Sequence, residues 1–152
     1  MAEPPFDLAK AHRWFAVELN NLAWDLVERD ARTPDEAERM VHAAHAACYH
    51  WLHAGTPLNH QRALCLLSTA YAAAGRAGEA VRYAEACLAL CAQLAEEVMS
   101  FDRATAHGCA ARALALAGRV DEARGHDARA LAAVGRLGED DRKVFERLYP
   151  AP

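Results

Sequence analysis

The stretch Leu64–Leu90, LCLLSTAYAAAGRAGEAVRYAEACLAL, decides the fold. It contains two alanine-rich runs with apolar residues at helical spacing, and the turn AAGRAG separates them. Gly75 is a helix-stop signal, and Glu79 adds an acidic residue where the dipole of a second helix favours negative charge. The stretch therefore predicts two antiparallel helices joined by a short turn.

The same turn occurs three times along the chain. The pair Glu-Ala recurs with a period of 43 residues, in the segments DARTPDEA, AAGRAGEA and LAGRVDEA. Self-similarity at one fixed period is typical of repeat architectures, in which each unit buries its apolar face against the next. We therefore expect three helical hairpins in a chain of 152 residues.

The expected elements follow from these turns. No segment alternates apolar and polar residues as a strand would, so the predicted fold class is all-α. Thr33, with Pro34 and Glu36 after it, has the sequence of a capping box at a helix start. We expect one domain over 1–152, with repeats at 6–54, 56–97 and 100–138, helices at 6–29, 34–53, 57–75, 78–97, 100–118 and 120–137, and a C-terminal capping helix at 139–149.

The second unit has large, aromatic, turn-glycine and small residues at the spacing of a known helical repeat: Leu67, Tyr71, Gly75, Ala80 and Cys87. By these residues it resembles the tetratricopeptide repeat. The first and third units match that pattern at fewer positions. The resemblance implies a right-handed array of hairpins that binds partners in a concave groove. The expected second helix is rich in histidine, with HAAHAACYHWLHAG at His42–Gly55, and the turn GTPLN follows at Gly55–Asn59. In these two features the chain is similar to a group of small bacterial helical-repeat proteins, a likeness that implies no activity. The matching residues of the other two units are Ala111, Gly118, Ala123 and Ala130 in the third and Trp24, Ala37 and Ala44 in the first.

Composition excludes several classes of function. The net charge of -4 gives no basic surface for phosphate groups, so nucleic acid is not an expected partner. No apolar run reaches the 18 or so residues of a membrane span, and MAEPPFDLAK does not resemble a signal peptide. These features predict a cytoplasmic protein. Its five cysteines lack a CxxC motif and are expected to serve as small buried side chains.

The segment His42–Gly55, HAAHAACYHWLHAG, is the most unusual part of the chain. On a helix of 100° per residue, His42, His45 and Tyr49 lie along one flank of the apolar stripe, whereas His50 points to solvent. We expect the preceding helix to place a polar face at the same level, because three of its polar residues follow i, i+3, i+7 spacing. These residues are Glu18, Asn21 and Asp25.

Together these polar residues would form a polar seam between the first two helices, and three explanations of this seam stay open. A buried carboxylate needs a partner, so the simplest is a structural network of carboxylates, imidazoles and Tyr49. The second is a divalent metal site, zinc or iron, held by His42, His45 and Glu18 or Asp25. The third is a metal-free pocket in which a carboxylate and a histidine act as an acid and base pair. The candidate catalytic residues of the seam are Glu18, Asp25 and Tyr49.

The groove of the array is the other candidate site. By the repeat alignment it is lined by Arg62, Thr69, Thr105 and Arg112, and two arginines favour an acidic peptide or a small carboxylate ligand. Asn21, in the polar seam, is a further candidate for ligand binding. The sequence thus predicts a binding module with a polar pocket in the first hairpin. The alternative is a small metal-dependent hydrolase or acid-base enzyme. An apolar face on the first helix, with Trp14, Val17 and Trp24, further allows a homodimer.

Overall fold

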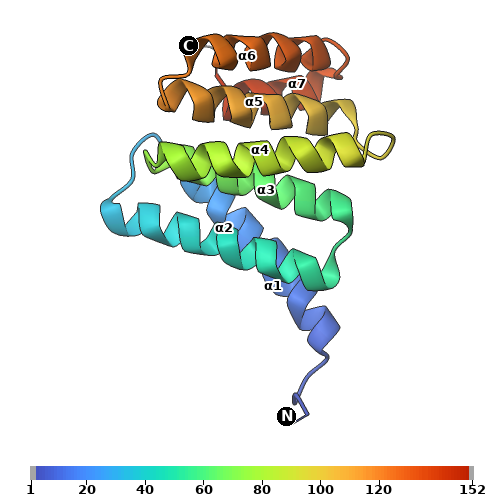
Figure 1. The fold of residues 1–152 in the computed structure, drawn as a ribbon. Helices are drawn as coiled ribbons and strands as arrows, with labels where there is room; N and C mark the ends of the chain where they lie inside the picture. Colours follow the sequence, from blue (N-terminus) through green and yellow to red (C-terminus); the bar gives the residue numbers. More distant parts are fainter. Residues whose placement is uncertain (1–2, 151–152) are drawn as a thin grey trace.

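The computed structural model describes residues 3–150, and all its regular structure is helical (Figure 1). The predicted all-α class and the hairpin array are confirmed. The helix ends agree closely with the expected ones, and the largest difference is at α4, which ends at Gln93 instead of Glu97. The helices are α1 Leu8–Val27, α2 Pro34–Ala54, α3 Pro57–Ala73, α4 Ala77–Gln93, α5 Ser100–Leu116, α6 Val120–Val134 and α7 Glu139–Leu148.

Glycine ends the first helix of the second and third hairpins. Gly75 has a φ of 73° and Gly118 a φ of 76°, in the left-handed region that other residues adopt at a cost. At each turn two backbone N–H groups bond back to carbonyls of the last helical turn, as in the Schellman motif: Arg76 N lies 2.9 Å from Tyr71 O, and Arg119 N lies 2.9 Å from Leu114 O. The repeated GR dipeptide therefore reverses the chain in the same way twice.

Side-chain caps begin α2 and α3. The Thr33 hydroxyl accepts from the backbone N–H of Glu36, and the Glu36 carboxylate accepts from the N–H of Thr33, which confirms the predicted capping box. Thr56 and Asn59 form the same reciprocal pair at the start of α3. Each cap satisfies two backbone donors that lack helical partners.

The helices form two layers, one of α1, α3 and α5 and one of α2, α4 and α6 (Figure 1). The central helix α3 packs against α1, α2, α4 and α5, and every residue from Ala63 to Tyr71 is buried. Alanine fills many of the remaining core positions, which lets the helix backbones approach closely. Arg62 and Thr105, which are predicted to line a groove, belong to α3 and α5 of the first layer.

The C-terminal helix α7 does not only cover the end of the array, as its predicted role as a cap implies. It packs against α5, where Phe145 and Leu148 are buried, and the Tyr149 hydroxyl reaches α3. Gly108 of α5 permits this approach, because a Cβ there would meet two Tyr149 ring carbons at 3.0 Å. The helix therefore lies along the layer of α1, α3 and α5.

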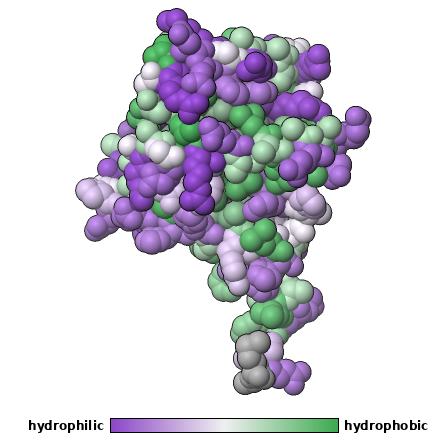
Figure 2. Space-filling view, viewed as in Figure 1, coloured by the Kyte–Doolittle hydropathy of each residue, from purple (hydrophilic) through white to green (hydrophobic). Residues whose placement is uncertain are grey.

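Helix α1 projects beyond the other helices at its N-terminal end (Figure 1). Its exposed apolar side chains include Trp14, which is 59% exposed, together with Phe15 and Val17. Figure 2 shows hydrophobic residues on this projecting segment. Within residues 3–150, no helix has the length and apolar character that crossing a membrane requires.

Candidate functional site

The acidic side of the expected polar seam does not face α2. Glu18, Asn21 and Asp25 are all exposed. The buried positions of α1 are small or aliphatic, with Ala16, Ala23, Leu26 and Val27 among them, and they lie on the opposite side of the helix. The expectation of buried carboxylates in the first hairpin is therefore wrong, because alanine and not the larger apolar residues marks the face of α1 that packs.

The histidines of α2 also separate. His42 is exposed, and Tyr49 is 57% exposed. His45 is half-buried and faces the second hairpin, where its Nε2 lies 2.7 Å from the Tyr71 hydroxyl. Burial, followed by the nearby charge of His42, lowers the pKa of His45. His45 thus belongs to an aromatic contact between hairpins that also includes Tyr83.

The structure does not bring the predicted metal ligands together. His42, His45 and Glu18 do not offer ligand atoms within 4.8 Å of one another, since the described residues contain one such group and it consists of cysteines. His50, expected in solvent, is half-buried, and its Nδ1 lies 2.8 Å from Nδ1 of His12 on α1. The catalytic and metal roles assigned to the first hairpin therefore stay predictions without a common site.

A pocket of about 470 Å³ opens on the layer of α1, α3 and α5. We call it the inter-helix pocket, because α1, α3, α5 and α7 all line it. One part of its wall is apolar, with Trp24 from α1, Phe101 from α5, and Val144 and Leu148 from α7. Its volume lies within the range of roughly 300 to 1,000 Å³ that is usual for small-molecule sites.

The charged part of the wall is built on Asp102, whose residue is 1% exposed. Its carboxylate accepts from Arg62 in a two-point contact, Nε to Oδ1 at 2.7 Å and Nη2 to Oδ2 at 3.2 Å. It also accepts from the backbone N–H of Met99 and so caps α5. The hydrogen bond to Asp102 raises the pKa of Arg62, so this cation is permanent and is held in one orientation.

Arg147 of α7 supplies a second cation, and it pairs with Glu28 at the end of α1, with Nε 3.0 Å from Oε2. This pair is more exposed than that of Arg62 and Asp102. It links the first and last helices across the pocket. The four charged groups of the wall are therefore two arginines and two carboxylates.

Part of the predicted groove is used to hold the C-terminal segment. Arg62 and Thr105 line the inter-helix pocket. Thr69 bonds instead to the Tyr149 hydroxyl at 2.9 Å, and Arg112 donates to the Leu148 carbonyl. Asn21 lies outside the pocket, although its neighbour Asn20 lines it.

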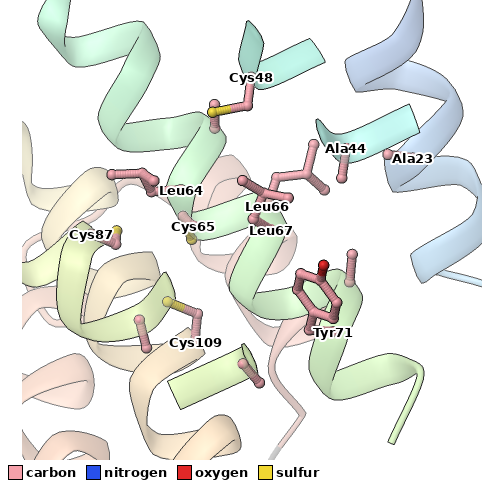
Figure 3. Packing of buried hydrophobic residues seen from close by; sticks show 14 of the residues in the cluster. Ala23, Ala44, Cys48, Leu64, Cys65, Leu66, Leu67, Tyr71, Cys87 and Cys109 are labelled. Carbon is pink, nitrogen blue, oxygen red and sulfur yellow. The ribbon is translucent and has the colours of Figure 1, made fainter. Parts of the chain in front are cut away.

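Three buried cysteines form a group that could hold a metal. Cys65 of α3, Cys87 of α4 and Cys109 of α5 have sulfur atoms within 4.8 Å of one another. Figure 3 shows the three side chains reaching into the space between these helices. Hydrogen bonds from the thiols of Cys109 and Cys87 lower the pKa of Cys65. The sequence does carry a signal for this group, because the three cysteines stand 22 residues apart on consecutive helices.

Comparisons with known proteins do not identify the chain: no family model, curated protein or solved structure matches it. The assignment of its repeats to the tetratricopeptide type thus stays a prediction. Function must be inferred from the pocket and from the side chains themselves.

Proposed function

We propose that this protein is a tetratricopeptide-like binding module whose inter-helix pocket takes a carboxylate ligand, either a small molecule or the acidic side chain of a peptide. The single observation that carries the proposal is the pocket of about 470 Å³, to which every hairpin and α7 contribute side chains. Its two arginines, Arg62 and Arg147, are its cations.

Arg62 is the better anchor for an anion. Asp102 fixes the guanidinium through Nε and Nη2, and Nη1 makes no hydrogen bond to any of the residues 3–150. Half of the Arg62 side chain stays exposed, so a ligand oxygen can reach this donor. A cation that is already oriented loses little conformational freedom when it binds, which favours affinity.

Arg147 offers a second contact if the ligand carboxylate takes the place of Glu28 in its ion pair. Its ion pair with Glu28 is largely exposed, and such pairs contribute only about 0 to 1 kcal/mol. A ligand carboxylate can therefore replace Glu28 at small cost. The apolar wall of Trp24 and Phe101 would then cover a hydrophobic part of the same ligand.

The proposal is tested with fragment-sized probes, observed by amide chemical shifts of ¹⁵N-labelled protein. Phenylacetate and phenylethylamine share an aromatic ring and differ in the sign of their charge. We expect phenylacetate to shift residues of the pocket on α3, α5 and α7 and phenylethylamine to leave them in place. Equal shifts with both probes would contradict a carboxylate site.

Matched variants identify the anchors. Arg147→Gln removes a pocket cation that is mostly exposed, so it should weaken phenylacetate binding without unfolding the protein. Arg39→Gln removes an exposed arginine from α2, in the other layer, and should leave binding unchanged. If the two variants bind alike, the pocket is not the carboxylate site.

A further inference from the structure

We propose that Cys65, Cys87 and Cys109 bind one zinc ion, with the side-chain oxygen of Gln61 as the fourth ligand. The three thiols come from three consecutive helices, so the site joins the second hairpin to the third. All three cysteines are buried. Neither the carboxylate pocket nor the predicted histidine site requires such a group.

The sulfur positions are close to those of a zinc site. Zinc binds thiolate at about 2.3 Å in a tetrahedral arrangement, so two sulfur atoms on one ion lie about 3.8 Å apart. The three sulfur atoms already lie within 4.8 Å of one another. Small rotations about the Cα–Cβ bonds of the cysteines would close the remaining difference, and the backbone need not move.

Gln61 supplies an independent indication of a fourth ligand. Its side chain is completely buried, and its Oε1 is the one buried side-chain nitrogen or oxygen in residues 3–150 that lacks a hydrogen-bond partner. An unsatisfied buried acceptor is unfavourable, so such atoms are rare without a reason. The amide touches the cysteine group, because Nε2 lies 3.2 Å from Cys87 Sγ.

A half-turn of the Gln61 amide exchanges its oxygen and nitrogen. Oε1 would then stand at the 3.2 Å that now separates Nε2 from Cys87 Sγ. An oxygen and a sulfur bound to the same zinc lie about 3.5 Å apart, as follows from tetrahedral angles and the usual bond lengths. The amide is therefore in place to complete a site of three sulfur atoms and one oxygen.

The charge of the site favours zinc over copper(I), the other common metal for thiolates. Binding of Zn²⁺ to three thiols releases three protons to solvent and leaves a complex with one negative charge. Copper(I) in the same site would leave two negative charges. Because a buried net charge is costly, the divalent ion suits an interior of alanine and leucine better.

An ion can reach this group from the inter-helix pocket. Cys65 is the member of the group that lines the pocket. The Tyr149 hydroxyl lies 3.4 Å from Cys65 Sγ, so the C-terminal segment covers the sulfur on that side. A brief displacement of this segment would expose Cys65 and admit the ion.

Cobalt(II) is the direct probe, because it takes the tetrahedral geometry of zinc and its thiolate complexes absorb strongly. Tag-free protein is fully reduced, freed of metal and titrated with Co²⁺ under nitrogen. We expect thiolate-to-cobalt absorption that saturates at one ion per chain and is abolished by one equivalent of Zn²⁺. Wild-type protein without these bands, or protein that retains copper(I) but neither Co²⁺ nor Zn²⁺, overturns the proposal.

Variants separate this group from the other thiols. Cys87→Ala and Cys109→Ala should lose stoichiometric binding, whereas Cys48→Ala and Cys91→Ala, which alter cysteines outside the group, should keep it. Gln61→Leu should weaken binding at least about tenfold, the scale found when groups around a metal site are removed. Each variant is checked by circular dichroism, and a folded Cys87→Ala protein that binds Co²⁺ as tightly as wild type also overturns the site.

Zinc should also stabilise the wild-type fold, since an ion that binds only the folded chain shifts the unfolding equilibrium. We expect a higher Tm with one equivalent of Zn²⁺ for wild type and for Cys91→Ala. The Tm of wild type does not depend on whether the cysteine variants fold. No rise in the Tm of wild type would contradict the site.

Discussion

Replacing Gly108 by alanine should loosen α7 from the array. The added Cβ would lie 3.0 Å from two ring carbons of Tyr149 and 3.1 Å from a ring carbon of Phe145. Contacts that short force the neighbours to move by a few tenths of an ångström. Gly108 lies inside α5, which is packed against α3, α4 and α6. The C-terminal segment with Phe145 and Tyr149 is therefore the part that moves.

Two opposing terms set the size of the effect. Alanine in the middle of a helix is more favourable than glycine by about 0.5 to 1 kcal/mol. Overpacking of a well-filled site costs about 1 to 3 kcal/mol. The balance is a net destabilisation of about 0 to 2.5 kcal/mol. Helix α7 bears it because few contacts other than those with α5 hold this helix.

Gly125→Ala is the matched control. Gly125 also lies inside a helix, and its new Cβ would meet only Arg129 Nη1, at an ordinary 3.7 Å. This variant keeps the helix-forming gain without overpacking, so it should be stabilised by about 0.5 to 1 kcal/mol. For a domain of this size, that corresponds to a rise of about 1 to 4 °C in Tm.

Hydrogen exchange measured by mass spectrometry locates the change. Gly108→Ala should speed the exchange of amides in 139–149 and leave α1 to α4 protected, and Gly125→Ala should change neither. Phenylacetate binding should weaken only in Gly108→Ala, because Val144 and Arg147 leave the wall of the inter-helix pocket. If Gly108→Ala raises Tm like the control and α7 stays protected, the docking of Tyr149 against Gly108 is refuted.

Three further predictions use other features of the structure. The Nδ1 atoms of His107 and His126 lie 2.9 Å apart, and burial, followed by the charges of His126 and Arg129, lowers the pKa of His107 to about 4. Because this pKa lies below the ordinary 6.5, the unfolded chain binds more protons than the folded chain between pH 6.5 and pH 4. The free energy of unfolding should therefore fall as the pH is lowered through that window, and it should fall less in His107→Gln. Urea denaturation at several pH values measures this free energy. Asp102→Asn should cost about 1 to 3 kcal/mol of stability in the same assay, because it weakens the bonds that Arg62 and the Met99 N–H donate to a buried carboxylate. Trp14→Glu should convert a homodimer to a monomer in sedimentation velocity if the projecting face of α1 is its interface, and an unchanged sedimentation coefficient would remove that interface.

The helices were predictable because their signals are local. Gly75 and Gly118 end helices through their own backbone freedom, and the Thr33 and Thr56 caps need only the residue three places later. None of these signals depends on what lies far away in the chain. The hairpins and their bounds could therefore be predicted from the sequence alone.

The first hairpin was misjudged because its apolar pattern is misleading. Trp14 and Val17 suggest a large apolar face, but both are exposed, although their neighbours Phe15 and Ala16 contact other helices or are buried. The packed face is marked by Ala16 and Ala23, which hydrophobicity weighs lightly. In an alanine-rich array, small residues identify the contact between helices better than large ones, and Asp25 would then have been placed in solvent.

The inter-helix pocket depends on a contact between distant parts of the chain. Repeat alignment puts Arg62 and Thr105 at equivalent positions, one period of 43 residues apart, and both line the pocket. It could not place Val144, Arg147 or Tyr149, because α7 lies outside the period and its position is set by the shape of α5 at Gly108. The missing side chain of one glycine thus decides which part of the groove is filled by the protein itself. What stays open is the part next to Arg62, where the proposed carboxylate ligand would bind.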